Sequence, residues 1–187
     1  SLDIEGLGKK VIDQFWDLNL IKKPSDIFNL NFEKIKKLEG WGELSIKNLE
    51  KAIKKSQTIF LDKFIFSIGI RHIGQENAKI MASFFTTIKE FSKLLDSDPR
   101  KKVLKNLIDL DGIGETQISS IDNFFLNKTN IQTTKELIQK LKIKDYLVKT
   151  KGGKFSNKKI MFTGGFKKIS RSEAKEIVEK NGGKVLG

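Results

Sequence analysis

The sequence contains no cysteine, and among its 187 residues it has only two prolines, one tyrosine and one histidine. Without cysteine, neither a disulfide nor a thiolate zinc site can form within these residues, which is typical of an intracellular protein. A single histidine excludes a metal site built from histidine and cysteine, and also a cysteine–histidine catalytic pair. The run of 18 or more apolar residues that a membrane-spanning helix needs is also missing, so we expect no membrane insertion.

Positive charge is in excess, because 36 Lys and Arg residues outnumber 23 Asp and Glu residues and give a net charge of +13. The excess is concentrated at one end, since residues 149–187 hold 11 basic and 3 acidic residues, a net charge of +8. Such a surplus favours a polyanionic partner such as nucleic acid. Almost all the basic residues are lysines, so biased base composition in the source genome is an alternative explanation.

A short Gly-apolar-Gly stretch recurs along the chain. It is found at Gly6–Gly8, Gly40–Gly42 and Gly112–Gly114, with a degenerate copy at His72–Gly74, and successive copies are 34, 32 and 40 residues apart. Recurrence with apolar residues at two fixed offsets indicates a genuine internal repeat. These residues precede or follow the copies at the same distance: Ile4, Leu38, Ile70 and Leu110 before them, and Ile12, Ile46, Ala78 and Ile118 after them.

Each repeat predicts a helix, a tight hairpin and a second helix, so the expected fold class is mainly α with four tandem helix-hairpin-helix motifs. The leading helix of the third copy is expected to begin near Thr58, and Asp98-Pro99 predicts the N-cap and first helical residue of the fourth. Another helix is expected over residues 133–141. Together these elements predict one compact helical domain over residues 1–144.

The helical pattern then stops, and residues 145–158, which include Gly152-Gly153, predict a linker. Residues 159–163 predict a strand, and Ser170-Arg171-Ser172-Glu173 is a capping box that predicts the start of a helix. A further strand is expected from Lys184. We therefore expect residues 159–187 to form an incomplete α/β segment.

A hairpin of this kind predicts contacts with the phosphates of DNA. The N-terminus of a helix presents unpaired N–H groups and the positive end of a dipole, and glycine lets a phosphate approach them. Such contacts carry no base information, so binding should be independent of sequence and strongly dependent on salt. The predicted contacts are Gly6, Leu7, Gly8, Lys9, Lys10, Gly40, Gly42, Lys47, Arg71, His72, Gly74, Lys79, Gly112, Gly114 and Thr116.

Several of these residues have a structural alternative. Glu43 and Glu115 directly follow two of the hairpins and would repel DNA, and any single hairpin could serve only as a corner between helices. We expect Trp41 to pack between helices rather than to stack on bases, and His72 to make a structural hydrogen bond rather than a phosphate contact. No constellation of catalytic residues emerges, so we assign no bond-making chemistry and no metal site to this chain.

Four segments together resemble the successive helix-hairpin-helix motifs of bacterial NAD-dependent DNA ligases, and the irregular third segment is the most specific. Residues 159–187, with Phe162-Thr163-Gly164 and Gly182-Gly183-Lys184-Val185, resemble the opening of the BRCT domain in the same family. The resemblance covers essentially the whole chain. The four segments are Asp3-Ile4-Glu5-Gly6-Leu7-Gly8, Leu38-Glu39-Gly40-Trp41-Gly42, Gly69-Ile70-Arg71-His72-Ile73-Gly74 and Asp111-Gly112-Ile113-Gly114.

The resemblance implies a noncatalytic part of an enzyme that encircles nicked duplex DNA and seals it in replication and repair. This part would bind no cofactor itself, whereas NAD, Mg and Zn are expected in the full-length ligase. The family's Lys-x-Asp-Gly motif and four-cysteine zinc finger would lie upstream of Ser1. The implied partners are nicked double-stranded DNA and the upstream domains of the same chain, in a cytoplasmic, nucleoid-associated monomer.

Two alternatives to this function stay open. The chain could be a helix-hairpin-helix module of another repair protein, such as a nuclease subunit, although the BRCT-like end argues against it. It could also be a noncatalytic scaffold for protein interactions that uses its hairpins only as corners.

Overall fold

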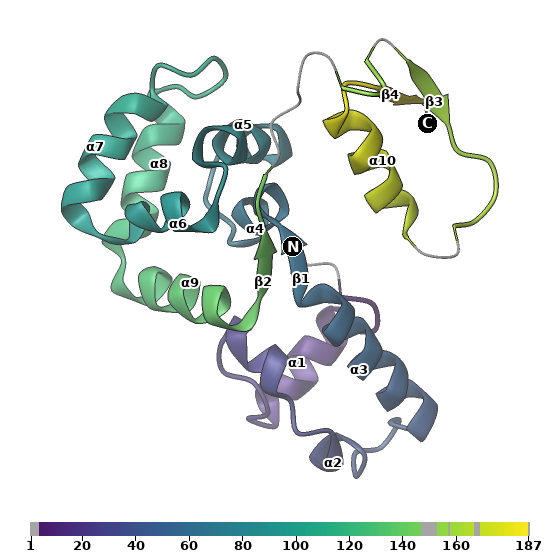
Figure 1. The fold of residues 1–187 in the computed structure, drawn as a ribbon. Helices are drawn as coiled ribbons and strands as arrows, with labels where there is room; N and C mark the ends of the chain where they lie inside the picture. The colour runs from purple at the N-terminus through teal and green to yellow at the C-terminus, as the bar shows by residue number, and fades with distance from the viewer. Residues whose placement is uncertain (1–3, 147–152, 157, 167–168, 187) are drawn as a thin grey trace. The chain divides into compact units, whose positions relative to one another are not determined.

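The computed structural model describes residues 4–146, 153–156, 158–166 and 169–186, and the chain divides into two compact units, Ser1–Tyr146 and Leu147–Gly187 (Figure 1). The described chain is mainly helical, which confirms the coarse fold class predicted from the sequence. The first unit contains α1 (Lys9–Asp17), η1 (Pro24–Asn29), α2 (Phe32–Ile35), α3 (Glu43–Ser56), β1 (Thr58–Phe60), α4 (Leu61–Ser67), α5 (Gln75–Phe85), α6 (Ile88–Phe91), η2 (Ser92–Leu95), α7 (Ser97–Leu107), α8 (Glu115–Leu126), α9 (Lys128–Lys140) and β2 (Lys142–Lys144).

The first unit has two hydrophobic clusters instead of one continuous core. The larger is organised around Phe91, whose ring lies edge-on to Phe64, Phe85 and Phe125 at centroid distances of 6.0, 5.4 and 6.1 Å. Edge-to-face contacts of this kind stabilise a core beyond the burial of area alone. We call this the large cluster, and the small cluster comprises Phe15, Ile21, Leu30, Ile35, Leu49 and Ile53.

Residues 58–60 form a strand, so the prediction that a helix begins near Thr58 is wrong. β1 pairs in parallel with β2, from Thr58 opposite Lys142 to Phe60 opposite Lys144 (Figure 1). β-branched and aromatic residues favour this extended conformation, but the pairing partner lies far along the chain and has no local signal. The helix of the third repeat therefore begins only at Leu61.

The leading helix of the fourth repeat begins earlier than predicted. Asp96, not Asp98, occupies the N-cap position of α7, and Pro99 is the third helical residue rather than the first. The first N–H groups of a helix have no intrahelical partner, so proline is tolerated anywhere in this turn. The expected helix over residues 133–141 is confirmed as α9, where the side chain of Asn127 accepts a hydrogen bond from the N–H of Thr129 at 2.8 Å.

Arg100 is a buried charge that connects three elements of the large cluster. Its Nε donates to Asp122 Oδ1 at 3.0 Å, and its Nη1 donates to the carbonyl oxygens of Phe125 at 2.8 Å and Leu94 at 3.2 Å. Burying a guanidinium is tolerable only when its donors are satisfied in this way. The single arginine of α7 thereby joins that helix to α8 and η2.

The second unit is a small β-α-β arrangement of β3 (Lys159–Met161), α10 (Arg171–Lys180) and β4 (Lys184–Leu186), with the strands parallel. The predicted capping box is confirmed: Ser170 Oγ accepts from the N–H of Glu173 at 3.1 Å, and Glu173 Oε2 accepts from the N–H of Ser170 at 2.8 Å. Ala174 and Val178 form the buried face of the helix. Strand, helix and strand therefore follow the predicted order.

Candidate nucleic-acid interface

Four turns repeat the same backbone geometry within the first unit. In each, the N–H of the fourth residue donates to the carbonyl oxygen of the first, at distances between 3.0 and 3.2 Å. We call them turn 1 (residues 4–8), turn 2 (38–42), turn 3 (70–74) and turn 4 (110–114). The donor and acceptor pairs are Leu7 and Ile4, Trp41 and Leu38, Ile73 and Ile70, and Ile113 and Leu110.

The third residue of every turn has a left-handed backbone. The φ angles are +81° at Gly6, +83° at Gly40, +62° at His72 and +88° at Gly112. A positive φ at this position is typical of a type II turn and normally requires glycine. His72 therefore takes the place of the first glycine in the irregular copy, at a cost of about 1–2 kcal/mol for a left-handed L-residue.

A second glycine ends each turn and immediately precedes a helix. Gly8, Gly42, Gly74 and Gly114 are the N-cap residues of α1, α3, α5 and α8, and each has an extended backbone. A Cβ added at Gly8 or Gly42 would meet no atom within 4 Å. The space in front of these two helix N-termini is therefore open to a ligand.

Turns 1 and 2 form the first hairpin pair, which packs through Trp41. The Trp41 ring lies 5.3 Å from that of Phe15 between centroids, and its Nε1 donates to Gln14 Oε1 at 3.2 Å. Trp41 is half-buried against the small cluster. These contacts confirm that Trp41 packs between helices.

Turns 3 and 4 form the second hairpin pair, which is joined by Asn77. Its Nδ2 donates to the carbonyl oxygen of Gly112 at 2.7 Å, while its Oδ1 accepts from the N–H of Gly74 at 3.3 Å. In turn 4, Gln117 Oε1 accepts from the N–H of Gly114 at 3.1 Å. In the second pair, the N–H of each N-cap glycine is thus hydrogen-bonded to the side chain of the third residue of the helix that follows it, and we call such an amide closed.

The first hairpin pair has no such closure. Its helices carry Val11 and Ser45 at the positions equivalent to Asn77 and Gln117. Within residues 4–146, no hydrogen-bond acceptor is paired with the N–H of Gly8 or of Gly42. Asn77 and Gln117 are not among the residues predicted from the sequence, although the spacing Gly-x-x-Asn/Gln, a variant of the capping box, distinguishes the second pair from the first.

The side chains that are predicted to contact phosphates differ in how far they are exposed to solvent. Lys9 and Lys10 are exposed in the first turn of α1, and Lys47, Arg71 and Thr116 are exposed as well. The structure thus leaves these five predicted contacts open to solvent.

Other predicted contacts are less available. Lys79 is partly buried and forms an ion pair with Glu76 at 2.7 Å. Glu43 pairs with Lys36 at 3.2 Å, which offsets part of its repulsion toward a phosphate. Among the described residues, the exposed His72 imidazole makes no hydrogen bond, so its predicted structural hydrogen bond is wrong. The structural contribution of His72 comes from its backbone.

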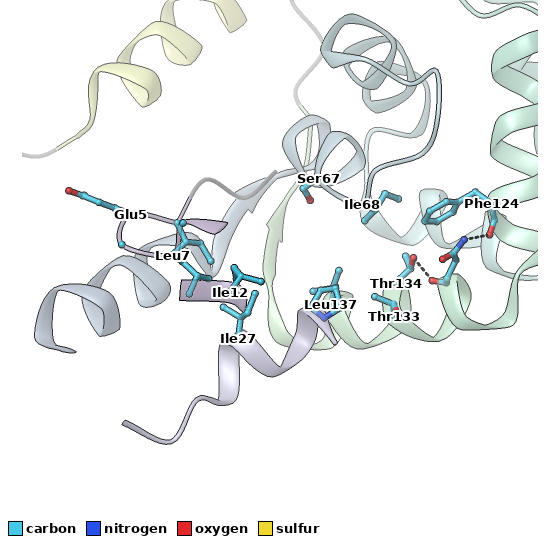
Figure 2. A pocket seen from close by; sticks show the side chains of 15 residues that line it. Glu5, Leu7, Ile12, Ile27, Ser67, Ile68, Phe124, Thr133, Thr134 and Leu137 are labelled. Atoms are coloured by element: carbon cyan, nitrogen blue, oxygen red, sulfur yellow. Dashed lines mark hydrogen bonds between the residues drawn. The ribbon is translucent and has the colours of Figure 1, made fainter. Parts of the chain in front are cut away.

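Two open pockets border turn 1. One, of about 900 Å³, lies between turns 1 and 2 and includes Gln14, Trp41 and Lys51 in its lining. The other, of about 770 Å³, is lined by turn 1 together with residues of η1, α8 and α9. Figure 2 shows Leu7 and Ile12 on one side of this second pocket and Phe124 and Thr133 on the other.

Neither a metal centre nor a membrane-spanning element is found in the part of the chain that the structure describes. No three residues among the described His, Cys, Asp and Glu gather closely enough to hold a metal ion. None of the described helices is long and apolar enough to cross a membrane.

Two family models match the chain in the order predicted from its sequence. The helix-hairpin-helix motif matches residues 63–134, which include turns 3 and 4. The BRCA1 C Terminus (BRCT) domain matches residues 150–187, which include β3, α10 and β4.

Curated relatives extend the match to the whole chain. A DNA ligase of Pelagibacter ubique is 47% identical over 186 residues, which is 100% of this chain and 27% of the relative. DNA ligases of Rickettsia typhi and Rickettsia prowazekii are 42% and 41% identical over 193 residues, 99% of this chain and 28% of each relative. The chain therefore aligns over essentially its whole length with a little over a quarter of each of these DNA ligases, and it matches the helix-hairpin-helix and BRCT family models within that length.

Proposed function

We propose that the first unit binds duplex DNA through its phosphates, without reading base sequence, and that its four turns belong to four tandem helix-hairpin-helix motifs. The observation that carries this proposal is the repetition of one turn geometry before four helices, with glycine at every N-cap. Helix N-termini of this kind attract phosphate oxygens through N–H groups and the helix dipole.

The first hairpin pair is the stronger phosphate site in this proposal. Gly8 and Gly42 have open amides, and the exposed Lys9 and Lys10 add positive charge beside turn 1. In the second pair, a phosphate would have to displace the side chains of Asn77 and Gln117 before it reached the N-cap amides. The remaining contacts predicted from the sequence contribute around these positions.

The relatives suggest the role of this DNA contact. We assign the chain to the noncatalytic, DNA-gripping part of an NAD-dependent ligase that seals nicks in replication and repair in the cytoplasm. Its partners would then be nicked duplex DNA and the other domains of the ligase, which would supply the sites for NAD, Mg and Zn. The division into residues 1–144, 145–158 and 159–187 belongs to the same proposal.

A salt series with nicked duplexes tests the DNA contact directly. The chain should bind two duplexes of unrelated sequence with similar affinity, and the logarithm of the association constant should fall linearly with the logarithm of salt concentration. Strong preference for one sequence, or binding that salt does not change, would contradict phosphate recognition. Absence of binding at low salt would favour the interaction-scaffold alternative.

A matched pair of glycine variants separates DNA contact from folding. Gly8→Val places a side chain in open space at an extended backbone, so it should keep the helical circular dichroism and weaken DNA binding roughly tenfold by blocking a phosphate. Gly165→Val makes an equally uncrowded change in the second unit and should leave binding unchanged. Loss of folding in Gly8→Val would favour a purely structural turn.

A further inference from the structure

The first unit consists of two halves, residues 4–57 and 58–146, each with its own hydrophobic cluster. The first half holds the first hairpin pair and the small cluster, and the second half holds the second hairpin pair and the large cluster. Among the described residues, Phe28 of η1 is the one apolar side chain that packs against both clusters. No continuous core therefore fixes the two halves to each other.

The pocket of about 770 Å³ lies between these halves. Leu7 and Ile12 line it from the first half, and Ile68 and Phe124 line it from the second (Figure 2). An open space of this size means that apolar side chains here lack the close packing of a protein interior. Apart from Phe28 and the hydrogen bond that the N–H of Lys142 donates to the carbonyl oxygen of Gln57 at 2.7 Å, the orientation of the halves then depends on the side-chain contacts beside the pocket.

Those contacts are polar and join η1 to α9. Glu136 accepts from Lys23 Nζ at 2.7 Å through Oε1 and from Ser25 Oγ at 2.5 Å through Oε2. One turn further along α9, Lys140 Nζ donates to Asn29 Oδ1 at 3.1 Å. Every one of these bonds crosses from one half of the unit to the other.

The Glu136 carboxylate accepts three hydrogen bonds at this junction. Gln132 donates to Oε1 at 3.0 Å from the preceding turn of α9, and Ser25 is only 2% exposed. Hydrogen bonds to an ionised group are short and strong, and a buried hydroxyl that loses its acceptor is left unsatisfied. Removing Glu136 therefore breaks two bonds between the halves at once, those from Lys23 and Ser25.

We propose that Glu136 and Lys140 of α9, together with Lys23, Ser25 and Asn29 at η1, form a latch that fixes the first hairpin pair relative to the second. With the latch closed, the two pairs act as one bivalent surface on a single duplex. The latch is a property of the protein alone, whereas the bivalent contact rests on the proposed DNA-binding function.

The latch can be tested by distance measurements on the whole 187-residue chain without DNA. Because the sequence has no cysteine, Asp13→Cys on α1 and Lys101→Cys on α7 provide two unique sites for spin labels, and both positions are exposed. We expect a narrow distance distribution in the parent chain and a broadened or shifted one after Glu136→Ala. Ser25→Ala, which keeps the charge, should broaden it less.

The matched control is Glu90→Gln, which removes an exposed ion pair with Lys93 (2.6 Å) inside the second half and should leave the distribution unchanged. The proposal is overturned if Glu136→Ala and Ser25→Ala keep both the helical circular dichroism and the parent distribution. If Glu136→Ala fails to fold, the distance distribution of Ser25→Ala decides whether the latch proposal stands.

DNA affinity then tests the bivalent contact separately. Opening the latch should lower affinity for a duplex long enough to reach both hairpin pairs by up to about tenfold, because loosely joined pairs must be ordered on binding whereas fixed pairs are already in place. A duplex that reaches only one pair should bind parent and variant equally. Absence of DNA binding in the parent chain would overturn the proposed function. The latch would then still be tested by the distance measurement, which needs no DNA.

Discussion

The two hairpin pairs have the same backbone geometry and differ in the side chains beside their N-cap amides. All four turns have the same hydrogen bond and a left-handed third residue, yet only the second pair closes its N-cap amides, with Asn77 and Gln117. The first pair leaves the amides of Gly8 and Gly42 open and adds exposed lysines. Turn geometry and readiness to bind phosphate are therefore set by different residues, so a repeated motif does not imply a repeated function.

The largest effect should come from forcing a side chain into the contact between turn 4 and α5. Gly112→Ala combines left-handed strain with a Cβ that would lie 2.7 Å from Ile80 Cδ1, the end of a side chain that has to move aside, so we expect a loss of about 2 kcal/mol in unfolding free energy. Gly40→Ala in the first pair has the same strain but meets no atom within 4 Å, and should lose about 1 kcal/mol. Urea denaturation measures both, and equal losses would contradict tighter packing of the second pair.

The next effect concerns charge beside the open turn. Replacing Lys9 and Lys10 by Gln should reduce the slope of log affinity against log salt by about two and weaken binding roughly tenfold, because each lysine neutralises one phosphate. Glu115→Gln beside turn 4 removes a repulsive charge and should change affinity much less. A larger effect of the second variant would reverse the proposed ranking of the pairs.

Acid should loosen the contact between the two hairpin pairs by protonating the Glu136 carboxylate of the latch. Hydrogen bonds from Lys23, Ser25 and Gln132 lower the pKa of Glu136 from 4.5 to about 2. A depressed pKa stabilises the fold above the unfolded value of 4.5, and this contribution is lost as the pH falls toward 2.

Glu136→Gln should therefore be less stable than the parent at pH 7, and the difference should shrink between pH 4.5 and 2. The neighbouring charged residues, Lys23 and Asp26 at η1 and Lys140 on α9, are the same in the parent chain and in Glu136→Gln. Urea midpoints across that range provide the measurement. A difference independent of pH would show that the charge of Glu136 does not contribute.

The smallest effect is expected at the irregular turn. His72→Gly relieves left-handed strain of about 1–2 kcal/mol. The greater freedom of glycine in the unfolded chain offsets about 0.5–1 kcal/mol of this gain in unfolding free energy. A net gain of a few tenths to about 1 kcal/mol should remain in thermal or urea unfolding. Loss of stability instead would mean that the imidazole makes a contribution that the backbone does not explain.

The sequence by itself determined the features that depend on a few neighbouring residues. The register of the turns, the N-cap glycines and the capping box at Ser170 all follow from local sterics and hydrogen bonding. The helix predicted over residues 133–141 follows from apolar spacing in the same way. Even the closure of Gly74 by Asn77 had a local signal, three residues away.

Only the tertiary structure decided which distant segments meet. Thr58–Phe60 became a strand because Lys142–Lys144 lies beside it, and Arg100 could be buried because Asp122 and two carbonyl oxygens receive its donors. The bonds from Lys23 and Ser25 to Glu136 likewise join residues more than a hundred positions apart. Such contacts depend on how the chain packs, and a lone Glu or Ser in the sequence carries no signal of its partner.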